Sequence, residues 1–136
     1  IFFFFLGLVI FGFFITQISR YFLDGEFIRY FKIYKMQKEI SQLKDHTIIC
    51  GFGRNGREAA RVLKQTNNQV VIIETEQSKL HTEAADPVYY FLEADATRDE
   101  TLLSAGIMQA SAIISTLPDD ALNVFVCLTA KELKII

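Results

Sequence analysis

A glycine-rich segment in the first half of the chain constrains the fold more than any other feature. Gly51, Gly53 and Gly56 form a G-x-G-x-x-G pattern. The pattern follows the apolar, β-branched run 47–50 and precedes residues 57–65, which contain no Gly or Pro. This order predicts a strand, a tight turn and a helix, in which the first glycine permits the turn, the second lets a pyrophosphate approach the backbone, and the third allows close helix packing. The free N–H groups of the first helical turn would face the anion.

An acidic residue after the next apolar run strengthens this interpretation. Residues 70–73 (Val-Val-Ile-Ile) form a second predicted strand that ends at Glu74, 18 residues beyond Gly56. A carboxylate at the tip of the second strand is placed to accept the ribose hydroxyls of a nucleotide. A glycine pattern alone is often only a structural turn. Together with strand, helix, strand and acidic tip, it predicts a nucleotide-binding site.

Apolar runs and helical stretches continue to alternate along the chain. The pattern predicts a helix over 76–85, a strand over 88–92, a helix capped by Thr97 and Glu100 that runs to Gly106, a strand over 112–116, a helix over 121–133 and the start of a fifth strand at 134–136. Such alternation predicts an α/β fold, a Rossmann-like parallel sheet with helices on both faces. A ligand would lie at the carboxyl ends of the strands, where we expect Gly51, Glu74, Asp95 and Thr116.

The last predicted helix carries apolar residues on more than one face, namely Leu122, Val124, Phe125, Val126, Cys127 and Leu128. A helix of this kind is usually buried on two sides. We expect it to pack against the sheet on one side and another subunit on the other. The two cysteines, Cys50 and Cys127, lie in apolar elements without a C-x-x-C or His/Cys cluster, so we expect packing roles and no metal site.

The start of the chain has a different composition. Residues 1–18 carry no charge, and seven of the chain's 13 Phe lie among the first fifteen residues. An 18-residue helix rises about 27 Å, close to the ~30 Å of a bilayer's hydrocarbon core. A signal peptide would show a basic leader and a cleavage site, and a core helix is rarely apolar on every face. The sequence therefore predicts a transmembrane helix over 1–22, and we expect it to continue upstream of Ile1.

A basic helical segment, residues 23–45, follows. Within it, Ile33, Met36, Ile40 and Leu43 repeat at spacings of 3, 4 and 3, which is typical of the seam of a short coiled helix. Residues 19–45 carry six basic and four acidic side chains, which places the chain from about residue 23 onward in the cytoplasm by the positive-inside rule. Residues 46–136 carry eight basic and twelve acidic side chains, which argues against a nucleic-acid partner.

The order of these segments resembles a known family. An apolar helix, a basic linker and the segment from His46 to Gly56 (H-T-I-I-C-G-F-G-R-N-G) are followed by Glu74 and by the segments 93–97 (E-A-D-A-T), 105–107 (A-G-I) and 128–133 (L-T-A-K-E-L). Together they resemble the prokaryotic ligand-gated potassium channels with a cytoplasmic RCK domain (regulator of potassium conductance, TrkA-N-like). The resemblance implies a tetrameric K⁺ channel of the cell membrane with a ring of RCK domains. It assigns 1–22 to the pore-lining helix, 23–45 to the linker and 46–136 to a nucleotide-binding domain truncated at its C-terminal end.

The resemblance also implies a cofactor and the residues that hold it. The 51–56 loop would hold the phosphates, with Arg54 as a further contact; Glu74 would hold the adenosine ribose, and Asp95 and Ala96 would lie beside the adenine. The full candidate set is Gly51, Phe52, Gly53, Arg54, Asn55, Gly56, Glu74, Thr75, Asp95, Ala96 and Thr116. An acidic Glu74 would repel a 2′-phosphate, so we expect NAD or NADH, or alternatively ADP or ATP, rather than NADP. Asp95 also falls where some relatives place a Ca²⁺ ligand, but their other ligands come from residues beyond Ile136.

Three functions remain open at this point. They are a ligand-gated potassium channel, the regulatory domain of another cation transporter or antiporter, and an NAD-dependent dehydrogenase. A dehydrogenase needs a catalytic acid or base near the nicotinamide and a substrate domain. The two histidines, His46 before the first strand and His81 in the second helix, belong to no catalytic set, so we expect no enzyme. A potassium selectivity filter would lie before Ile1 and would distinguish a channel from the alternatives.

Overall fold

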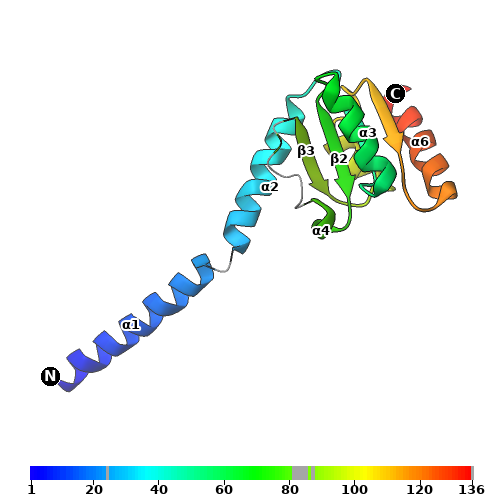
Figure 1. Cartoon of the computed structure of the whole chain (residues 1–136). Helices are drawn as coiled ribbons and strands as arrows, with labels where there is room; N and C mark the ends of the chain where they lie inside the picture. Colours follow the sequence, from blue (N-terminus) through cyan, green and yellow to red (C-terminus); the bar gives the residue numbers. More distant parts are fainter. Residues whose placement is uncertain (24, 81–85, 87, 136) are drawn as a thin grey trace. The chain divides into compact units, whose positions relative to one another are not determined.

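The computed structural model describes residues 1–23, 25–80, 86 and 88–135. They form two compact units, Ile1–Tyr34 and Lys35–Ile136. The elements are α1 (Phe2–Leu23), α2 (Glu26–Ser41), β1 (Thr47–Cys50), α3 (Arg54–Gln65), β2 (Val70–Glu74), α4 (Gln77–Leu80), β3 (Tyr89–Glu93), α5 (Asp99–Ser104), β4 (Ala112–Ser115) and α6 (Asp120–Ile135) (Figure 1).

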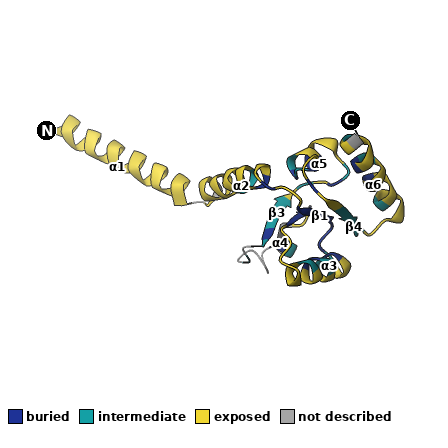
Figure 2. Ribbon diagram, turned by 90° about the horizontal axis from the view of Figure 1, so that it is seen from above, coloured by how far each residue is buried: buried dark blue, intermediate teal, exposed yellow. Residues whose placement is uncertain are grey.

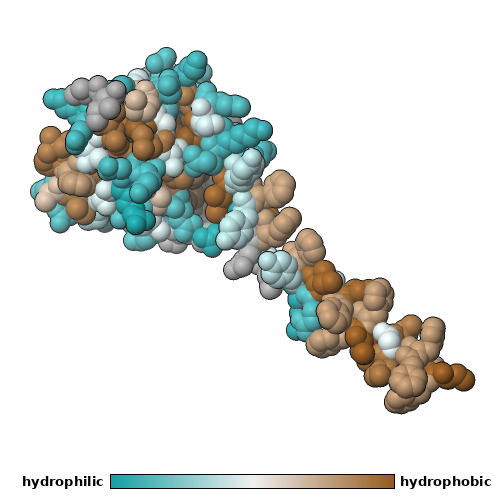
Figure 3. Space-filling model, turned by 180° about the vertical axis from the view of Figure 1, so that it is seen from behind, coloured by the Kyte–Doolittle hydropathy of each residue, from teal (hydrophilic) through white to brown (hydrophobic). Residues whose placement is uncertain are grey.

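The first helix, α1, is apolar along its length and has no buried residue. Figure 3 shows its brown, hydrophobic side chains on the face in view. The helical stretch that starts at Phe2 is long and apolar enough to cross a membrane by length and composition. The predicted helix is therefore confirmed, while its place in a membrane stays a prediction. At the break that follows, Gly25 has a φ of +70°, a left-handed conformation that suits glycine; Asp24 lies outside the described residues.

The second half of α2 and the turn after it belong to the second unit. They contribute three side chains to a hydrophobic cluster shared with the sheet, Met36, Ile40 and Leu43. Gln37 Nε2 also donates to the Ser104 carbonyl oxygen at 2.8 Å. The compact unit thus begins at Lys35, earlier than the predicted boundary at His46. Three of the four residues of the 3-4-3 apolar repeat therefore pack on this domain, whereas Ile33 belongs to the first unit and is 49% exposed.

Four parallel strands form one sheet in the order β3-β2-β1-β4. Alternate strand residues point to opposite faces, so Ile48 joins a cluster with α2, α5 and α6 residues, whereas Ile49 joins one with α3 and α4 residues. Figure 2 shows β1 in the dark blue of buried residues, with helices around it. Because both faces of a parallel sheet are covered, its strands are continuous apolar runs. The Rossmann-like parallel sheet is confirmed.

The end of the chain differs from the prediction. The helix α6 runs to Ile135, so the fifth strand expected at 134–136 is wrong for Lys134 and Ile135, and Ile136 lies outside the described residues. No Gly or Pro separates Leu133 from Lys134, so nothing in the sequence ends the helix there. Lys134 Nζ also donates to the Ala110 carbonyl oxygen, which holds the last turn against the domain.

Several predicted boundaries also need correction; β4 ends at Ser115, α5 ends at Ser104 and α6 begins at Asp120. The helix α3 begins at Arg54 rather than at residue 57, and β3 spans Tyr89–Glu93 instead of 88–92. Thr97 does not cap α5, whose N-cap position is Arg98, because the N–H and hydroxyl of Thr97 both donate to Asp95. Of the helix predicted over 76–85, the structure describes Gln77–Leu80, and residues 81–85, including His81, lie outside the described residues.

Candidate functional site

Two of the three motif glycines are required by the chain's own packing. Gly51 has a φ of +93°, and a Cβ there would lie 2.9 Å from the Thr116 carbonyl oxygen. A Cβ on Gly56 would lie only 2.0 Å from the Gly51 carbonyl oxygen. The turn after β1 and the first turn of α3 therefore approach each other so closely that no side chain fits between them. This backbone approach fixes the shape of the loop.

The middle glycine, Gly53, is different. It occupies the N-cap position of α3 with a φ of −78°, which any residue can adopt. A Cβ there would meet no atom within 4 Å. The space that a Gly53 side chain would occupy is therefore open, and no contact within the described chain requires glycine at this position. The first-turn N–H groups of a helix lack intrahelical acceptors and favour an anion.

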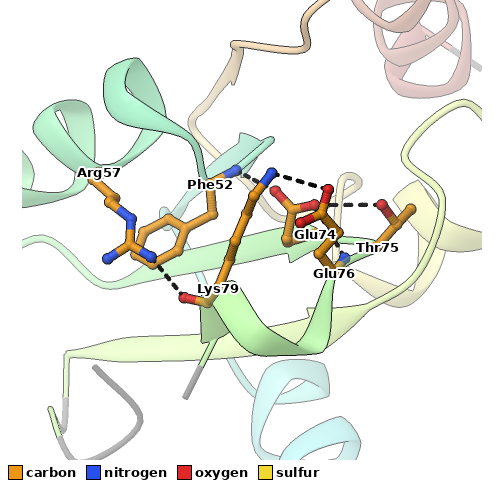
Figure 4. A network of polar contacts seen from close by, with 6 residues as sticks. All are labelled: Phe52, Arg57, Glu74, Thr75, Glu76 and Lys79. Carbon is orange, nitrogen blue, oxygen red and sulfur yellow. Dashed lines mark hydrogen bonds and ion pairs between the residues drawn. The ribbon is translucent and has the colours of Figure 1, made fainter. Parts of the chain in front are cut away.

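The carboxylate of Glu74 links the end of β2 to the glycine loop (Figure 4). Its Oε2 accepts from the Phe52 N–H at 2.7 Å, and its Oε1 accepts from the Glu76 N–H at 3.1 Å and from the Thr75 hydroxyl at 3.3 Å. Glu74 is only 8% exposed. Burial alone would raise the pKa of this carboxyl, but the N–H donors of Phe52 and Glu76, helped by nearby Lys79, hold the pKa below its ordinary value. The group is therefore an anion at neutral pH.

The end of β4 supports the loop from the other side. The Thr116 hydroxyl lies 3.1 Å from the carbonyl oxygens of both Cys50 and Gly51, and its N–H donates to Cys50 at 2.8 Å. Thr116 therefore fixes the start of the glycine loop through the backbone. Among the eleven candidate residues, hydrogen bonds therefore join the glycine loop to Glu74 and Thr116, and Thr75 to Glu74.

The side chains of the other candidates differ in their bonding and burial. The exposed Asp95 accepts from the N–H and hydroxyl of Thr97 at 2.9 and 2.7 Å, and these bonds lower the pKa of its carboxyl. The side chains of Ala96 and Phe52 are buried in the two hydrophobic clusters. Arg54, Asn55 and Thr75 are exposed.

Two side chains that shape the site were missed by the sequence analysis. On α6, the Asn123 amide accepts from the Ser115 hydroxyl and the Leu117 N–H, both at 2.7 Å, and donates to the Leu117 carbonyl oxygen at 2.9 Å. It therefore holds the turn that contains Thr116. On α3, the Arg57 guanidinium lies over the Phe52 ring. The sequence offered only a weak signal for either, an amide early in an apolar helix and a basic residue directly after the motif.

A polar hollow of about 390 Å³ lies at the opposite end of the sheet from the glycine loop. Its lining residues precede β1, β2 and β3 along the chain; they are Lys44, Asp45, Asn67, Asn68, Gln69 and Val88. In the part of the chain that the structure describes, no group of three or more His, Cys, Asp or Glu residues is placed to hold a metal ion. The candidate site is therefore the surface made by the glycine loop, the α3 N-terminus and Glu74.

Comparison with known proteins gives a family match and several relatives. The model of the TrkA-N domain matches residues 47–136. The chain is 41% identical over 119 residues to Potassium channel protein 1 of Methanocaldococcus jannaschii, covering 86% of this chain and 35% of that protein. It is 35% identical over 129 residues to Probable potassium channel protein 2 of the same organism, covering 93% and 37%. It therefore spans about a third of the length of both. A 34% identical match over 96 residues to the glutathione-regulated potassium-efflux system protein KefC of Enterobacter sp. covers 69% of this chain and 15% of KefC.

Solved structures show the same fold. The TrkA-N domain of the inner membrane protein ybaL from Escherichia coli aligns with a TM-score of 0.62 at 20% identity and covers 67% of each chain. The GsuK channel bound to NAD aligns with a TM-score of 0.59 at 22% identity, covering 68% of this chain and 17% of that one. At these identities the likeness establishes the fold alone.

Proposed function

The chain belongs to the TrkA-N domain family, and from this premise we propose that it is part of a potassium channel whose pore is gated by a nucleotide. Residues 1–22 would be the pore-lining helix, 23–45 the linker and 46–136 the cytoplasmic nucleotide-binding domain. Two relatives named as potassium channel proteins, which align over most of this chain, support the proposal. So does a first helix that is long and apolar enough for a bilayer. In this proposal the domain regulates the opening of the pore and catalyses no reaction.

One observation carries the nucleotide site: the open space at Gly53. Gly51 and Gly56 are explained by the chain's own backbone, but a Cβ on Gly53 would touch nothing. A glycine that internal packing does not require, placed at a helix N-terminus, is suited to a phosphate that needs close access to the backbone. Arg54 and Asn55 are exposed beside it and are placed for further contacts with a dinucleotide.

The ligand we propose is NAD or NADH, with ADP or ATP as the alternative. Glu74 is an anion whose two oxygens already accept three hydrogen bonds, and an ionised carboxylate has room for about four. It would accept from a ribose hydroxyl and would repel a 2′-phosphate. Structures of the related GsuK fold were solved with NAD and with ADP, which agrees with both alternatives. Asp95 and Ala96 would lie on the adenine side, with Asp95 the exposed member of the pair.

An exposed apolar face on α6 supports an oligomer. Val124, Phe125 and Leu128 are 59, 50 and 62% exposed, although the helix also contributes Val126 and Ala130 to the core. A helix with apolar residues on two sides usually packs against a different element on each side. We propose that this face packs on a second copy, within a tetrameric channel that conducts K⁺ across the cell membrane and keeps the domains in the cytoplasm.

The binding site is tested by titrating the full-length protein with NAD and ADP in a calorimeter. We expect saturable binding for at least one of the two. Gly53→Val should abolish it by filling the open space, with no change in melting temperature. Gln65→Val, at the far end of the same helix, is the matched control and should bind normally. Normal binding by Gly53→Val would remove the phosphate role of the loop.

Gating is tested on the reconstituted protein by single-channel recording with the nucleotide added to the cytoplasmic side. We expect the open probability for K⁺ to change with nucleotide concentration. The match to KefC keeps the regulatory domain of another cation transporter as a second candidate. Nucleotide binding without any K⁺ conductance would favour that candidate, and steady consumption of NADH would contradict both.

A further inference from the structure

We propose that Arg57 is a positioning residue that holds the phosphate side and the ribose side of the nucleotide site in a fixed relation. The inference rests on the proposed nucleotide site and adds to it a residue outside the motif and outside the candidate set. Arg57 lies in the first turn of α3, just after the glycine pattern. Its side chain reaches away from its own helix, and its contacts include one to the glycine loop and one to α4 (Figure 4).

The first contact is with Phe52, the residue between the first two glycines. The Arg57 guanidinium carbon lies 4.7 Å from the centroid of the Phe52 ring, within the range of a cation–π contact. Within the buried cluster, the Phe52 ring also lies edge to face with Phe91, whose centroid is 6.0 Å away. The backbone N–H of Phe52 is the group that donates to Glu74. Arg57 therefore packs on Phe52, the residue whose N–H joins the glycine loop to the Glu74 carboxylate.

The second contact is with the segment that follows Glu74. Arg57 Nη2 donates to the Lys79 carbonyl oxygen in α4 at 3.0 Å. Lys79 in turn pairs with Glu76 at 3.3 Å, and the Glu76 N–H donates to Glu74. A cation is favourable beside the last carbonyl groups of a helix, which have no intrahelical donors. Arg57 therefore ties α4, and through it the Glu74 turn, to α3.

These contacts close a ring. Arg57 contacts the Phe52 side chain, and the Phe52 N–H donates to Glu74. Glu74 also accepts from the Glu76 N–H, and the Glu76 carboxylate pairs with Lys79. The Lys79 carbonyl oxygen accepts from Arg57, which closes the circuit of contacts. One side of the ring carries the α3 N-terminus, where phosphates would bind, and the other carries the carboxylate for the ribose. A ligand that bridges both sides gains affinity when their separation is fixed before it binds. Without Arg57, Phe52 and Glu74 keep their bond, and α4 keeps the hydrophobic contacts of Leu80 in the cluster shared with α3, but α4 loses this hydrogen bond to α3.

The test is a double-mutant cycle on NAD affinity with the full-length chain. The variants are Arg57→Ala, Glu74→Ala and the two combined. The matched control is Arg61→Ala, one turn further along α3, where the arginine bonds Glu58 of the same helix. We expect Arg57→Ala to weaken NAD binding about tenfold, the scale on which pre-organisation acts, and Arg61→Ala to leave it unchanged. Because Arg57 acts through the Glu74 turn, its removal should cost little more once Glu74 is alanine.

Hydrogen exchange without nucleotide gives a second readout. Arg57→Ala should speed amide exchange in residues 76–80 relative to wild type and Arg61→Ala, because α4 loses a hydrogen bond to α3. Arg57→Lys should give an intermediate result for exchange and affinity, since it keeps the charge but not the planar guanidinium.

Each outcome decides a different point. If wild type binds neither NAD nor ADP saturably, the proposed function and this inference fall together, and if it binds only ADP the cycle is run with ADP in place of NAD. If wild type binds and Arg57→Ala binds as tightly as Arg61→Ala, only the inference falls. Losses that add in the double variant would make Arg57 a direct phosphate contact or a general stabiliser, and would overturn a positioning role. Unchanged exchange in residues 76–80 would overturn it as well.

Discussion

The ends of β2 and β3 are neighbours in the sheet, where Glu74 and Glu93 are in register. The carboxylates of Glu74, at the end of β2, and Asp95, in the turn after β3, have different hydrogen-bond partners. Glu74 is buried and accepts the N–H of Phe52, 22 residues earlier in the chain. Asp95 is exposed and accepts two bonds from Thr97, two residues later. The first acid joins two loops, whereas the second stabilises its own turn. A carboxylate at the end of a strand thus connects two loops when the second loop places a hydrogen-bond donor beside it.

The close approach within the glycine loop supplies that donor. Gly51 and Gly56 let the turn after β1 fold tightly against α3, and this conformation directs the Phe52 N–H to Glu74. In the turn after β3, Asp95 takes its donors from Thr97 of the same turn. The difference between the strand ends of β2 and β3 therefore depends on Gly51 and Gly56. Substituting these glycines is the most direct test of that difference.

The largest effect is expected from Gly56→Ala. A Cβ would lie 2.0 Å from the Gly51 carbonyl oxygen, so the loop must move and the Phe52 donor moves with it. We expect the free energy of unfolding to fall by about 3 kcal/mol or more, measured by urea denaturation. Gly53→Ala is the control, because its Cβ meets open space and its stability should stay near that of wild type. Equal stabilities for the two variants would show that the loop geometry described here is wrong.

A smaller effect is expected from the charge on Glu74, and it depends on pH. The folded-state pKa of this carboxyl is below its ordinary value of 4.5, so the ionised group stabilises the fold above that pH and the contribution is lost as the pH falls through the lowered pKa. Glu74→Gln should cost about 1–3 kcal/mol at pH 7, the range for leaving a buried N–H poorly paired. The difference from wild type should shrink steadily toward acid.

The matched control for this titration is Asp95→Asn. Its carboxyl pKa is also lowered, but the group is exposed, so solvent screens its bonds and the variant should cost less at every pH. Urea denaturation from pH 3 to pH 7 measures both variants. A larger loss in the free energy of unfolding for Asp95→Asn than for Glu74→Gln would show that the carboxylate after β3, rather than the one at the end of β2, stabilises the fold more.

The sheet and the position of the glycine loop could be predicted because their signals are local. The runs 47–50 and 70–73 are β-branched and uninterrupted, and the glycine spacing falls directly between strand and helix. Element ends were less predictable. The helix α6 continues past Leu133 because nothing breaks it, and Thr97, a capping residue by sequence, bonds backward to Asp95 instead.

Contacts between distant segments could not be predicted. The position of Glu74 at a strand end predicts a role in the site, but the sequence does not show that its oxygen accepts from the Phe52 N–H. Arg57 and Lys79 are 22 residues apart and meet only because α3 and α4 flank the same strand. The same holds for Asn123, which fixes the turn after β4. Helix and strand patterns report which face is buried, and such long-range polar bonds follow only from the assembled fold.

The smallest effect is expected at the β3 end. Thr97→Val keeps the side-chain shape but removes the hydroxyl that donates to Asp95 at 2.7 Å. Because the bond is exposed and water can replace it, we expect a loss of about 0.5 kcal/mol or less and unchanged NAD affinity. Thr97→Ser, which keeps the hydroxyl, should match wild type in both measurements. If Thr97→Val instead weakens NAD binding as much as Glu74→Ala does, the turn after β3 acts in concert with the glycine loop, and the two strand ends form one binding surface rather than a site and its neighbour.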